Sequence, residues 1–120
     1  MKEIIRALDN QPLAIVDGRK FIINPLTEQI PFTSSELLSE TCKLISQKLK
    51  KEVTKLVTEE DKGGILVAGT SMITGLPFGM ARWYPNGLAN QISEKFNMEY
   101  CKGNLYLNGI LKGDKVAIID

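Results

Sequence analysis

The sequence contains no histidine in its 120 residues. Histidine is the base of Ser-His-Asp and Cys-His nucleophile systems and the commonest ligand of transition metals. Its absence excludes the first class and most sites of the second. Any chemistry must therefore use carboxylates, lysine, tyrosine or backbone amides.

Paired cysteines and long apolar segments are also missing. Cys42 and Cys101 lie far apart and outside any Cys-x-x-Cys motif, which favours two reduced thiols over a disulfide or a metal site. The apolar stretch at 64–74 is broken by Gly, Ser and Thr and is shorter than the roughly 20 residues that span a membrane. Residues 1–6 lack an apolar signal core. We expect a cytoplasmic protein that does not contact membranes.

Charge of one sign is scarce as well, since 15 basic and 14 acidic residues leave a net charge of +1. No global field would attract nucleic acid, so any anion must be bound by local groups. The composition, 43% hydrophobic and 24% charged, is typical of a globular protein. We expect one domain over residues 1–120, because the chain is too short for two ordinary ones.

The first part of the chain predicts a hairpin followed by a helix. Short apolar runs at 13–16 and 20–23 flank Asp17-Gly18, a pair that favours a tight antiparallel turn. Thr33-Ser34-Ser35-Glu36 has the spacing of a capping box, which predicts the start of a helix there. Apolar residues then recur at helical spacing as far as Leu49.

The middle of the chain predicts a strand, a helix and a second strand. Residues 55–58 are β-prone, a polar loop with two glycines covers 59–64, and an apolar run at 65–74 predicts a helix that ends at Gly75. Residues 76–84 predict the next strand. This order is typical of a mainly parallel sheet in an α/β protein.

The last part predicts a second hairpin and a buried strand. Strands at 96–100 and 104–107 are expected around a turn at Lys102-Gly103. The apolar run at 116–119 is of the kind found in strands that are buried on both faces. Such a strand needs neighbours, so we expect a longer protein or a second chain that completes the sheet.

Three places could carry chemistry. The loop at 59–64 joins a strand to a helix, where open α/β sheets bind ligands and helix amides attract anions, although a solvated connector has the same pattern. Asp120 follows the last strand, where a carboxylate can accept hydrogen bonds from sugar hydroxyls or simply be solvated. Arg82 precedes Trp83 and Tyr84, which could pack in the core or stack on a ligand.

Taken together, three segments resemble the type I phosphoribosyltransferase family, most closely its adenine and archaeal-type purine enzymes. These are Glu59-Glu60-Asp61-Lys62-Gly63-Gly64, then Thr74-Gly75-Leu76-Pro77-Phe78 with Ala81-Arg82-Trp83-Tyr84-Pro85, and then Gly103–Gly109 with Lys112–Asp120. In the family the last strand runs into two adjacent acids and a Thr-Gly-Gly-Thr phosphate loop. The chain contains the first acid, Asp120, so the resemblance implies a fragment or a truncated form.

The resemblance implies a partial phosphoribosyltransferase fold. Residues 1–32 would form a hood-like segment, and residues 33–120 would form an α/β core with an antiparallel hairpin at about 94–108. The family transfers ribose 5-phosphate from phosphoribosyl pyrophosphate to a base and uses Mg²⁺. The implied function is a purine, most closely an adenine, phosphoribosyltransferase of nucleotide salvage that forms a homodimer. Without the phosphate loop, the 120-residue chain is expected to bind the donor poorly.

The same resemblance implies roles for individual residues. Asp61, Lys62, Gly63 and Arg82 would contact pyrophosphate, and Asp120 would hold the ribose hydroxyls or the magnesium shell. The stretch with Glu99 and Tyr100 is similar to a mobile hairpin that closes over the site. Glu99 is then a candidate general acid or base, and Tyr100 a lid or base contact.

A second hypothesis stays open from the sequence. The chain could be a non-catalytic relative of the same fold that senses a nucleotide or regulates a partner. A structural fragment with no ligand is the third alternative.

Overall fold

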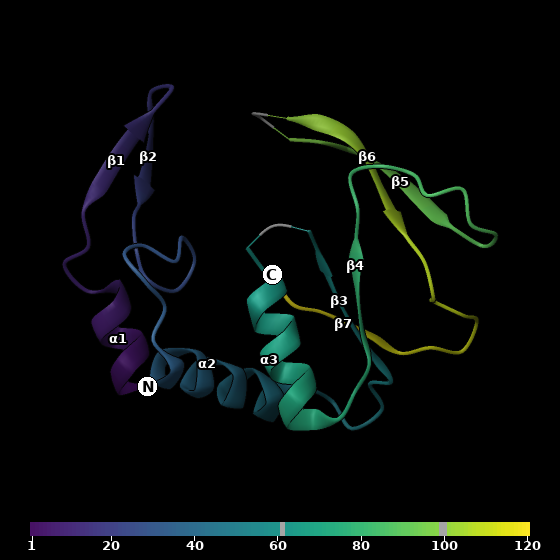
Figure 1. Ribbon diagram of the computed structural model, residues 1–120, viewed down its shortest axis with the longest axis horizontal. Coiled ribbons are helices and arrows are strands. Elements are labelled where there is room, and N and C mark those ends of the chain that lie inside the picture. The colour runs from purple at the N-terminus through teal and green to yellow at the C-terminus, as the bar shows by residue number, and fades with distance from the viewer. Residues whose placement is uncertain (61, 99–100) are drawn as a thin grey trace.

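The computed structural model describes residues 1–60, 62–98 and 101–120. Its elements, shown in Figure 1, are α1 (Lys2–Leu8), β1 (Leu13–Val16), β2 (Arg19–Ile22), α2 (Ser35–Lys48), β3 (Lys55–Glu59), α3 (Gly64–Thr74), β4 (Phe78–Ala81), β5 (Ile92–Asn97), β6 (Lys102–Leu107) and β7 (Val116–Ile118). No helix in this part of the chain has the length and apolar character needed to cross a bilayer.

The core is a three-stranded parallel sheet with the strand order β4-β3-β7. Leu56 of β3 and Val67 of α3 are fully buried, and Ile119, after β7, joins them in the main apolar cluster. Ile45 of α2 packs against the same cluster, so α2 and α3 cover one face of the sheet. The prediction of an α/β fold with a mainly parallel sheet and helices is confirmed.

β7 departs from the expectation of burial on both faces. Ala117 and Ile119 contribute to the core, whereas Val116 and Ile118 remain 38% and 79% exposed. Successive side chains of a strand point to opposite faces, and the described residues cover only the face toward the helices at β7. The expectation of a strand buried on both faces is therefore wrong for the described part of the chain.

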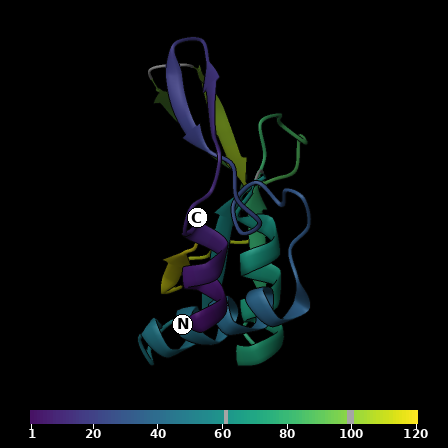
Figure 2. The same ribbon diagram turned by 90° about the vertical axis from the view of Figure 1, so that its left-hand side faces the viewer.

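Two antiparallel hairpins extend beyond the carboxyl ends of the core strands, as Figures 1 and 2 show from perpendicular directions. The hairpin β1–β2 forms as predicted around Asp17-Gly18. The hairpin β5–β6 also forms, but its turn lies elsewhere. Lys102 and Gly103 are paired with Asn97 and Phe96 inside the ladder, because β5 starts at Ile92 and the register carries both residues into β6. The predicted turn at Lys102-Gly103 is therefore wrong.

The helix α2 starts one residue after the position that the capping box predicts. Ser34 is the N-cap, and its Oγ accepts a hydrogen bond from the Leu37 amide at 3.1 Å. The Thr33 hydroxyl instead donates to the Pro25 carbonyl, in the loop that follows β2. Thr33 is thus used to hold the N-terminal segment, which leaves the cap to its neighbour.

β4 is shorter than the strand predicted over 76–84. After Ala81 the chain leaves β3 and pairs once with β6, where the Arg82 amide donates to the Tyr106 carbonyl at 2.7 Å. The Tyr106 amide donates back to the Arg82 carbonyl at 2.8 Å. This bridge attaches the hairpin β5–β6 to the core sheet.

Candidate functional site

A cleft of about 450 Å³ lies where β3 and β7 end, and the hairpin β5–β6 forms its opposite side. It is lined by Glu59, Lys62, Trp83, Phe96, Met98, Cys101, Leu105 and Asp120. The carboxyl ends of parallel strands meet at one edge of a sheet, which is why residues from distant segments reach this space. One wall is charged and the other is apolar.

The charged wall brings together three residues that the sequence singles out. Lys62 and Asp120 line the cleft, and Gly63 lies between them at the start of α3. A Cβ on Gly63 would lie 3.3 Å from Asp120 Oδ1, so the loop before α3 and the end of the last strand are in contact. The binding roles of these residues stay predictions.

Gly63 is required by this close approach. A side chain there would overlap Thr58 Oγ1 and would lie 3.0 Å from the Ile119 carbonyl oxygen. Thr58 is 1% exposed, and its hydroxyl has no hydrogen-bond partner within the described ranges. The hydroxyl is packed beneath Gly63, and the polar groups that this turn can offer to an anion are the free amides of the α3 N-terminus.

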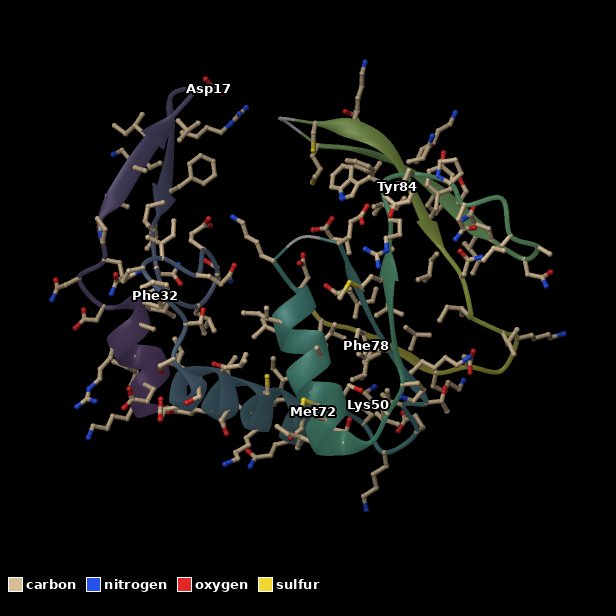
Figure 3. All side chains as sticks on the ribbon, viewed as in Figure 1. Asp17, Phe32, Lys50, Met72, Phe78 and Tyr84 are labelled. Atoms are coloured by element: carbon tan, nitrogen blue, oxygen red, sulfur yellow. The ribbon has the colours of Figure 1, made fainter. Side chains whose placement is uncertain are left out.

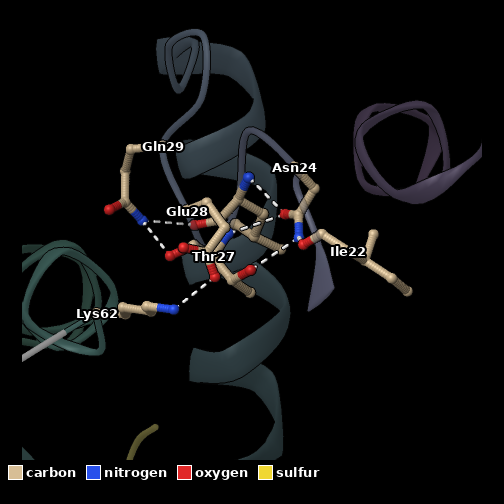
Figure 4. A network of polar contacts seen from close by, with 7 residues as sticks. Ile22, Asn24, Thr27, Glu28, Gln29 and Lys62 are labelled. Carbon is tan, nitrogen blue, oxygen red and sulfur yellow. Dashed lines mark hydrogen bonds and ion pairs between the residues drawn. The ribbon is translucent and has the colours of Figure 1, made fainter. Parts of the chain in front are cut away.

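Lys62 is joined to the N-terminal segment. Its Nζ contacts Glu28 Oε1 at 2.5 Å, as Figure 4 shows. Glu28 belongs to the loop after β2, so this ion pair links the N-terminal hairpin region to the loop before α3. Lys62, which is expected to bind pyrophosphate, is therefore paired with a carboxylate of the protein.

Arg82 is held at the rim by Glu60. Its Nη1 donates to Glu60 Oε2 at 2.9 Å, and the Trp83 amide donates to Glu60 Oε1 at 2.6 Å. The Trp83 amide, followed by the Arg82 guanidinium, lowers the pKa of the Glu60 carboxyl from its usual value. Arg82 is not among the lining residues of the cleft, and its contact with pyrophosphate stays a prediction.

The apolar wall is built on a pair of aromatic rings. Trp83 and Phe96 meet edge to face with ring centroids 4.9 Å apart. Trp83 is 42% exposed, so it neither packs fully in the core nor lies free of the cleft. Figure 3 shows the neighbouring Tyr84, which is 57% exposed. A flat or apolar part of a ligand could lie against this wall.

Comparison with known proteins agrees with this geometry. No protein-family model matches the chain. A hypoxanthine/guanine phosphoribosyltransferase from Methanohalobium evestigatum is 33% identical over 115 residues, which cover 96% of this chain and 60% of the relative. The protein of the same name from Methanothermobacter thermautotrophicus is 31% identical over 120 residues, or 100% of this chain and 62% of the relative. The chain thus spans about three fifths of the length of these relatives.

Solved structures give the same fold. The adenine phosphoribosyltransferase of Thermoanaerobacter pseudethanolicus superposes with a TM-score of 0.75 at 18% identity, over 98% of this chain and 69% of that one. The enzyme of Giardia lamblia complexed with 9-deazaadenine gives a TM-score of 0.73 at 19% identity, over 91% and 62%. The chain is thus similar over nearly its whole length to members of the type I phosphoribosyltransferase family, and it has their fold.

Three predicted site residues, Asp61, Glu99 and Tyr100, lie outside the described residues. The residues beside them, namely Lys62, Met98 and Cys101, line the cleft. The loop before α3 and the β5–β6 hairpin therefore both border the same space.

Trp83 was named from the sequence as a possible ligand contact, but the part of the apolar wall that comes from the β5–β6 hairpin was not predicted, although a signal for it exists. Phe96 and Met98 alternate on β5 and just beyond it, and Cys101 and Leu105 alternate across the hairpin with Gly103 between them. A period of two places these side chains on one face of the hairpin. Glu59 was missed as a single residue because it was read only as part of the polar loop.

The charged wall of the cleft fits a metal ion that the phosphates of a ligand would help to hold. Within the described ranges, no group of three His, Cys, Asp or Glu residues could enclose a metal ion. Glu59 and Asp120 nevertheless place two carboxylates on the cleft. Mg²⁺ usually keeps several waters and binds through one or two carboxylates together with phosphate oxygens.

Proposed function

We propose that this chain forms the pyrophosphate-side part of a purine phosphoribosyltransferase. The reaction transfers ribose 5-phosphate from phosphoribosyl pyrophosphate to a ring nitrogen of the base and releases pyrophosphate. One observation carries the proposal: Lys62 and Asp120 line one cleft, and Gly63, at the N-terminus of α3, lies against Asp120. The similarity to hypoxanthine/guanine phosphoribosyltransferases supports the reaction class.

The departing pyrophosphate would be stabilised by groups that are already in place. Negative charge grows on it as the bond to the sugar breaks, so positive charge and amides aimed at it lower the barrier. Lys62 would supply the charge, and the first amides of α3 would supply hydrogen bonds without reorganisation. Asp61 and Arg82 are proposed as further contacts of the same phosphates.

The sugar develops positive charge at the opposite end of that bond. A carboxylate close to its hydroxyls opposes this charge, and Asp120 is proposed for this role together with part of the magnesium shell. Bound Mg²⁺ would neutralise the phosphates of the donor. Glu99 is proposed to exchange a proton with the base, and Tyr100 to close over it.

The base is proposed to be a purine. The relatives that share about 30% of the sequence are named for hypoxanthine and guanine, whereas the solved neighbours at 18% and 19% identity are named for adenine and inform on the fold only. Adenine therefore stays a hypothesis, and the sequence relatives favour testing hypoxanthine and guanine beside it. The chain is proposed to form a homodimer through an exposed edge of the sheet.

The test is release of pyrophosphate from phosphoribosyl pyrophosphate with Mg²⁺ and each of three bases. It is run on the 120-residue chain and on the full product of its gene, as wild type, Lys62→Gln and Asp120→Asn, with Lys112→Gln as an exposed control. We expect base-dependent release by the full product, a loss of at least about tenfold in the two cleft variants, and no change in the control. Nucleotide binding without release would favour the sensing relative instead.

A further inference from the structure

The ion pair between Glu28 and Lys62 is the starting point of a further inference. Lys62 is the cation that the proposed function places on the departing pyrophosphate. In the structure this cation contacts the carboxylate of Glu28, with side-chain exposures of 46% for Lys62 and 22% for Glu28. A carboxylate and a phosphate offer the same kind of charged oxygen to an ammonium group. Glu28 thus stands where a phosphate oxygen of a ligand could stand.

The loop that presents Glu28 is fixed by a buried asparagine. Asn24 is 3% exposed, and its Oδ1 accepts the amides of Leu26 and Thr27, each at 2.9 Å. Its Nδ2 donates to Thr27 Oγ1 at 2.7 Å and to the Ile22 carbonyl at 3.3 Å. Figure 4 shows this network beside Glu28 and Lys62. Since the turn is held from within, Glu28 is aimed at Lys62 by local structure.

The pair is placed so that a stronger anion can replace it. An ion pair between partly exposed side chains contributes little to stability, because water screens it and both chains lose freedom. Pyrophosphate carries more charge than a carboxylate and could also accept the amides at the start of α3, which Glu28 does not contact in the hydrogen bonds of the described residues. Pyrophosphate would therefore displace the Glu28 carboxylate from Lys62.

Release of Glu28 from Lys62 would change how the N-terminal segment is held against the rest of the molecule. Figure 1 shows the β1–β2 hairpin on the opposite side of the molecule from the β5–β6 hairpin, and the loop with Glu28 leads from β2 toward α2. The ion pair between Lys62 and Glu28 joins residues 1–32 to the loop before α3. Losing that contact would let the turn, which Asn24 still holds together internally, move away from the loop before α3, and forming the contact would hold the segment against that loop.

We propose that Glu28 is a positioning residue that occupies Lys62 until a phosphate-bearing ligand displaces it, so that pyrophosphate binding and release of the 24–30 loop are coupled. The proposal rests on the proposed function, because it takes Lys62 as a phosphate contact. It adds Glu28, a residue of the N-terminal segment to which the family resemblance gave no role, to the proposed phosphate site. The coupling is reciprocal, as thermodynamic linkage requires.

The test is titration of inorganic pyrophosphate into the 120-residue chain, followed by calorimetry and by the fluorescence of Trp83, the single tryptophan, which lines the cleft. Glu28→Gln keeps the shape of the side chain and removes its charge. We expect it to bind pyrophosphate about two- to tenfold more tightly than wild type, while Lys62→Gln binds at least about tenfold more weakly. Glu52→Gln, an exposed control that changes the net charge equally, should match wild type.

A second readout separates coupling from a simple change of charge. Hydrogen exchange at residues 24–30 should accelerate when pyrophosphate is added to wild type, and should already be fast in ligand-free Glu28→Gln. Melting curves confirm that each variant is folded. If Lys62→Gln binds like wild type, or if wild type binds no pyrophosphate, the proposed phosphate site and this inference both fail. If Lys62→Gln is weak but Glu28→Gln matches wild type in affinity and exchange, the coupling alone is overturned.

Discussion

Gly63 is the position where an added Cβ atom would prevent the loop before α3 from lying close to Asp120. Thr58 Oγ1 fills the space of its missing Cβ, and the Ile119 carbonyl oxygen would lie 3.0 Å from that atom. Both neighbours belong to core strands or directly follow one, so neither can move away as a flexible side chain could. The loop before α3 can approach Asp120 only because residue 63 carries no side chain.

We therefore expect Gly63→Ala to destabilise the fold by about 1–3 kcal/mol, the usual cost of an extra methyl in a packed site. It should also weaken pyrophosphate binding, since the loop must shift away from Thr58. Denaturant unfolding and calorimetric titration measure the two effects.

The neighbouring glycine supplies the control for this prediction. A Cβ on Gly64 would meet Met80 Cε at 3.2 Å, the end of a flexible side chain, and alanine is the better helix former. Gly64→Ala should thus be neutral or slightly stabilising. Equal losses in both variants would contradict the steric argument, and Thr58→Ala should partly rescue Gly63→Ala.

At the level of single elements, the loop before β7 is tied to the start of β3 by Asp114. Its carboxylate accepts Lys55 Nζ and the Leu111 amide, each at 2.7 Å. Lys55 Nζ also donates to the Gly109 carbonyl at 2.6 Å. These contacts set the path by which the chain enters the last strand and so help to place Asp120.

The Lys55 hydrogen bond, followed by the Leu111 amide, lowers the pKa of Asp114 from its usual value. The unfolded chain then takes up this proton first as the pH falls. The stabilising contribution is complete above about pH 4, where an unperturbed Asp titrates, and is lost as the pH falls through the lower value of the folded state.

We expect Asp114→Asn to melt at a lower temperature than wild type near neutral pH, and the gap to narrow as the pH falls below about 4. Melting temperatures measured between pH 7 and pH 3 test this, with Asp9→Asn as an exposed carboxyl outside the network. A gap that is constant over the whole range would show that Asp114 does not act through its charge.

Elements with strong local signals were predictable from the sequence. The helix α2, the strand β3, the helix α3 and the first hairpin follow from caps, apolar periodicity and the Asp17-Gly18 turn. The seven-residue α1 was not predicted, because it has no side-chain cap and depends on α2. Glu40 of α2 forms an ion pair with the N-terminal amine and accepts a hydrogen bond from the Glu3 amide. The turn of β5–β6 was misplaced because cross-strand register, and not the Lys102-Gly103 pair, fixes it.

At the scale of the whole molecule, sheet topology made part of the site predictable from the sequence. Parallel strands deliver their carboxyl ends to one edge, which brings Lys62, Gly63 and Asp120 together from segments far apart in sequence. The partner of Lys62 was not predictable. Glu28 reaches it from a loop whose position depends on how the N-terminal segment docks, and no local pattern reports such a contact.

The sheet has two edges that differ in what they offer to another chain. Near the β4 edge, Met72 in the last turn of α3 and Phe78 at the start of β4, both labelled in Figure 3, are 88% and 43% exposed. At β7, Ile118 is 79% exposed. Exposed apolar residues at a strand edge favour association, because burying them removes apolar surface from water.

We expect the chain to self-associate through the segment at 72–78, and sedimentation velocity at several concentrations measures this against the 13.3 kDa of one chain. Met72→Lys should shift the chain toward monomer without changing its circular dichroism, because a charge in an apolar contact must be desolvated. Leu111→Lys, at a 66% exposed position in a loop, is the matched control and should leave association unchanged. If Ile118→Lys dissociates the chain and Met72→Lys does not, the contact lies at β7 instead. A monomer for wild type at every concentration would contradict self-association at either edge.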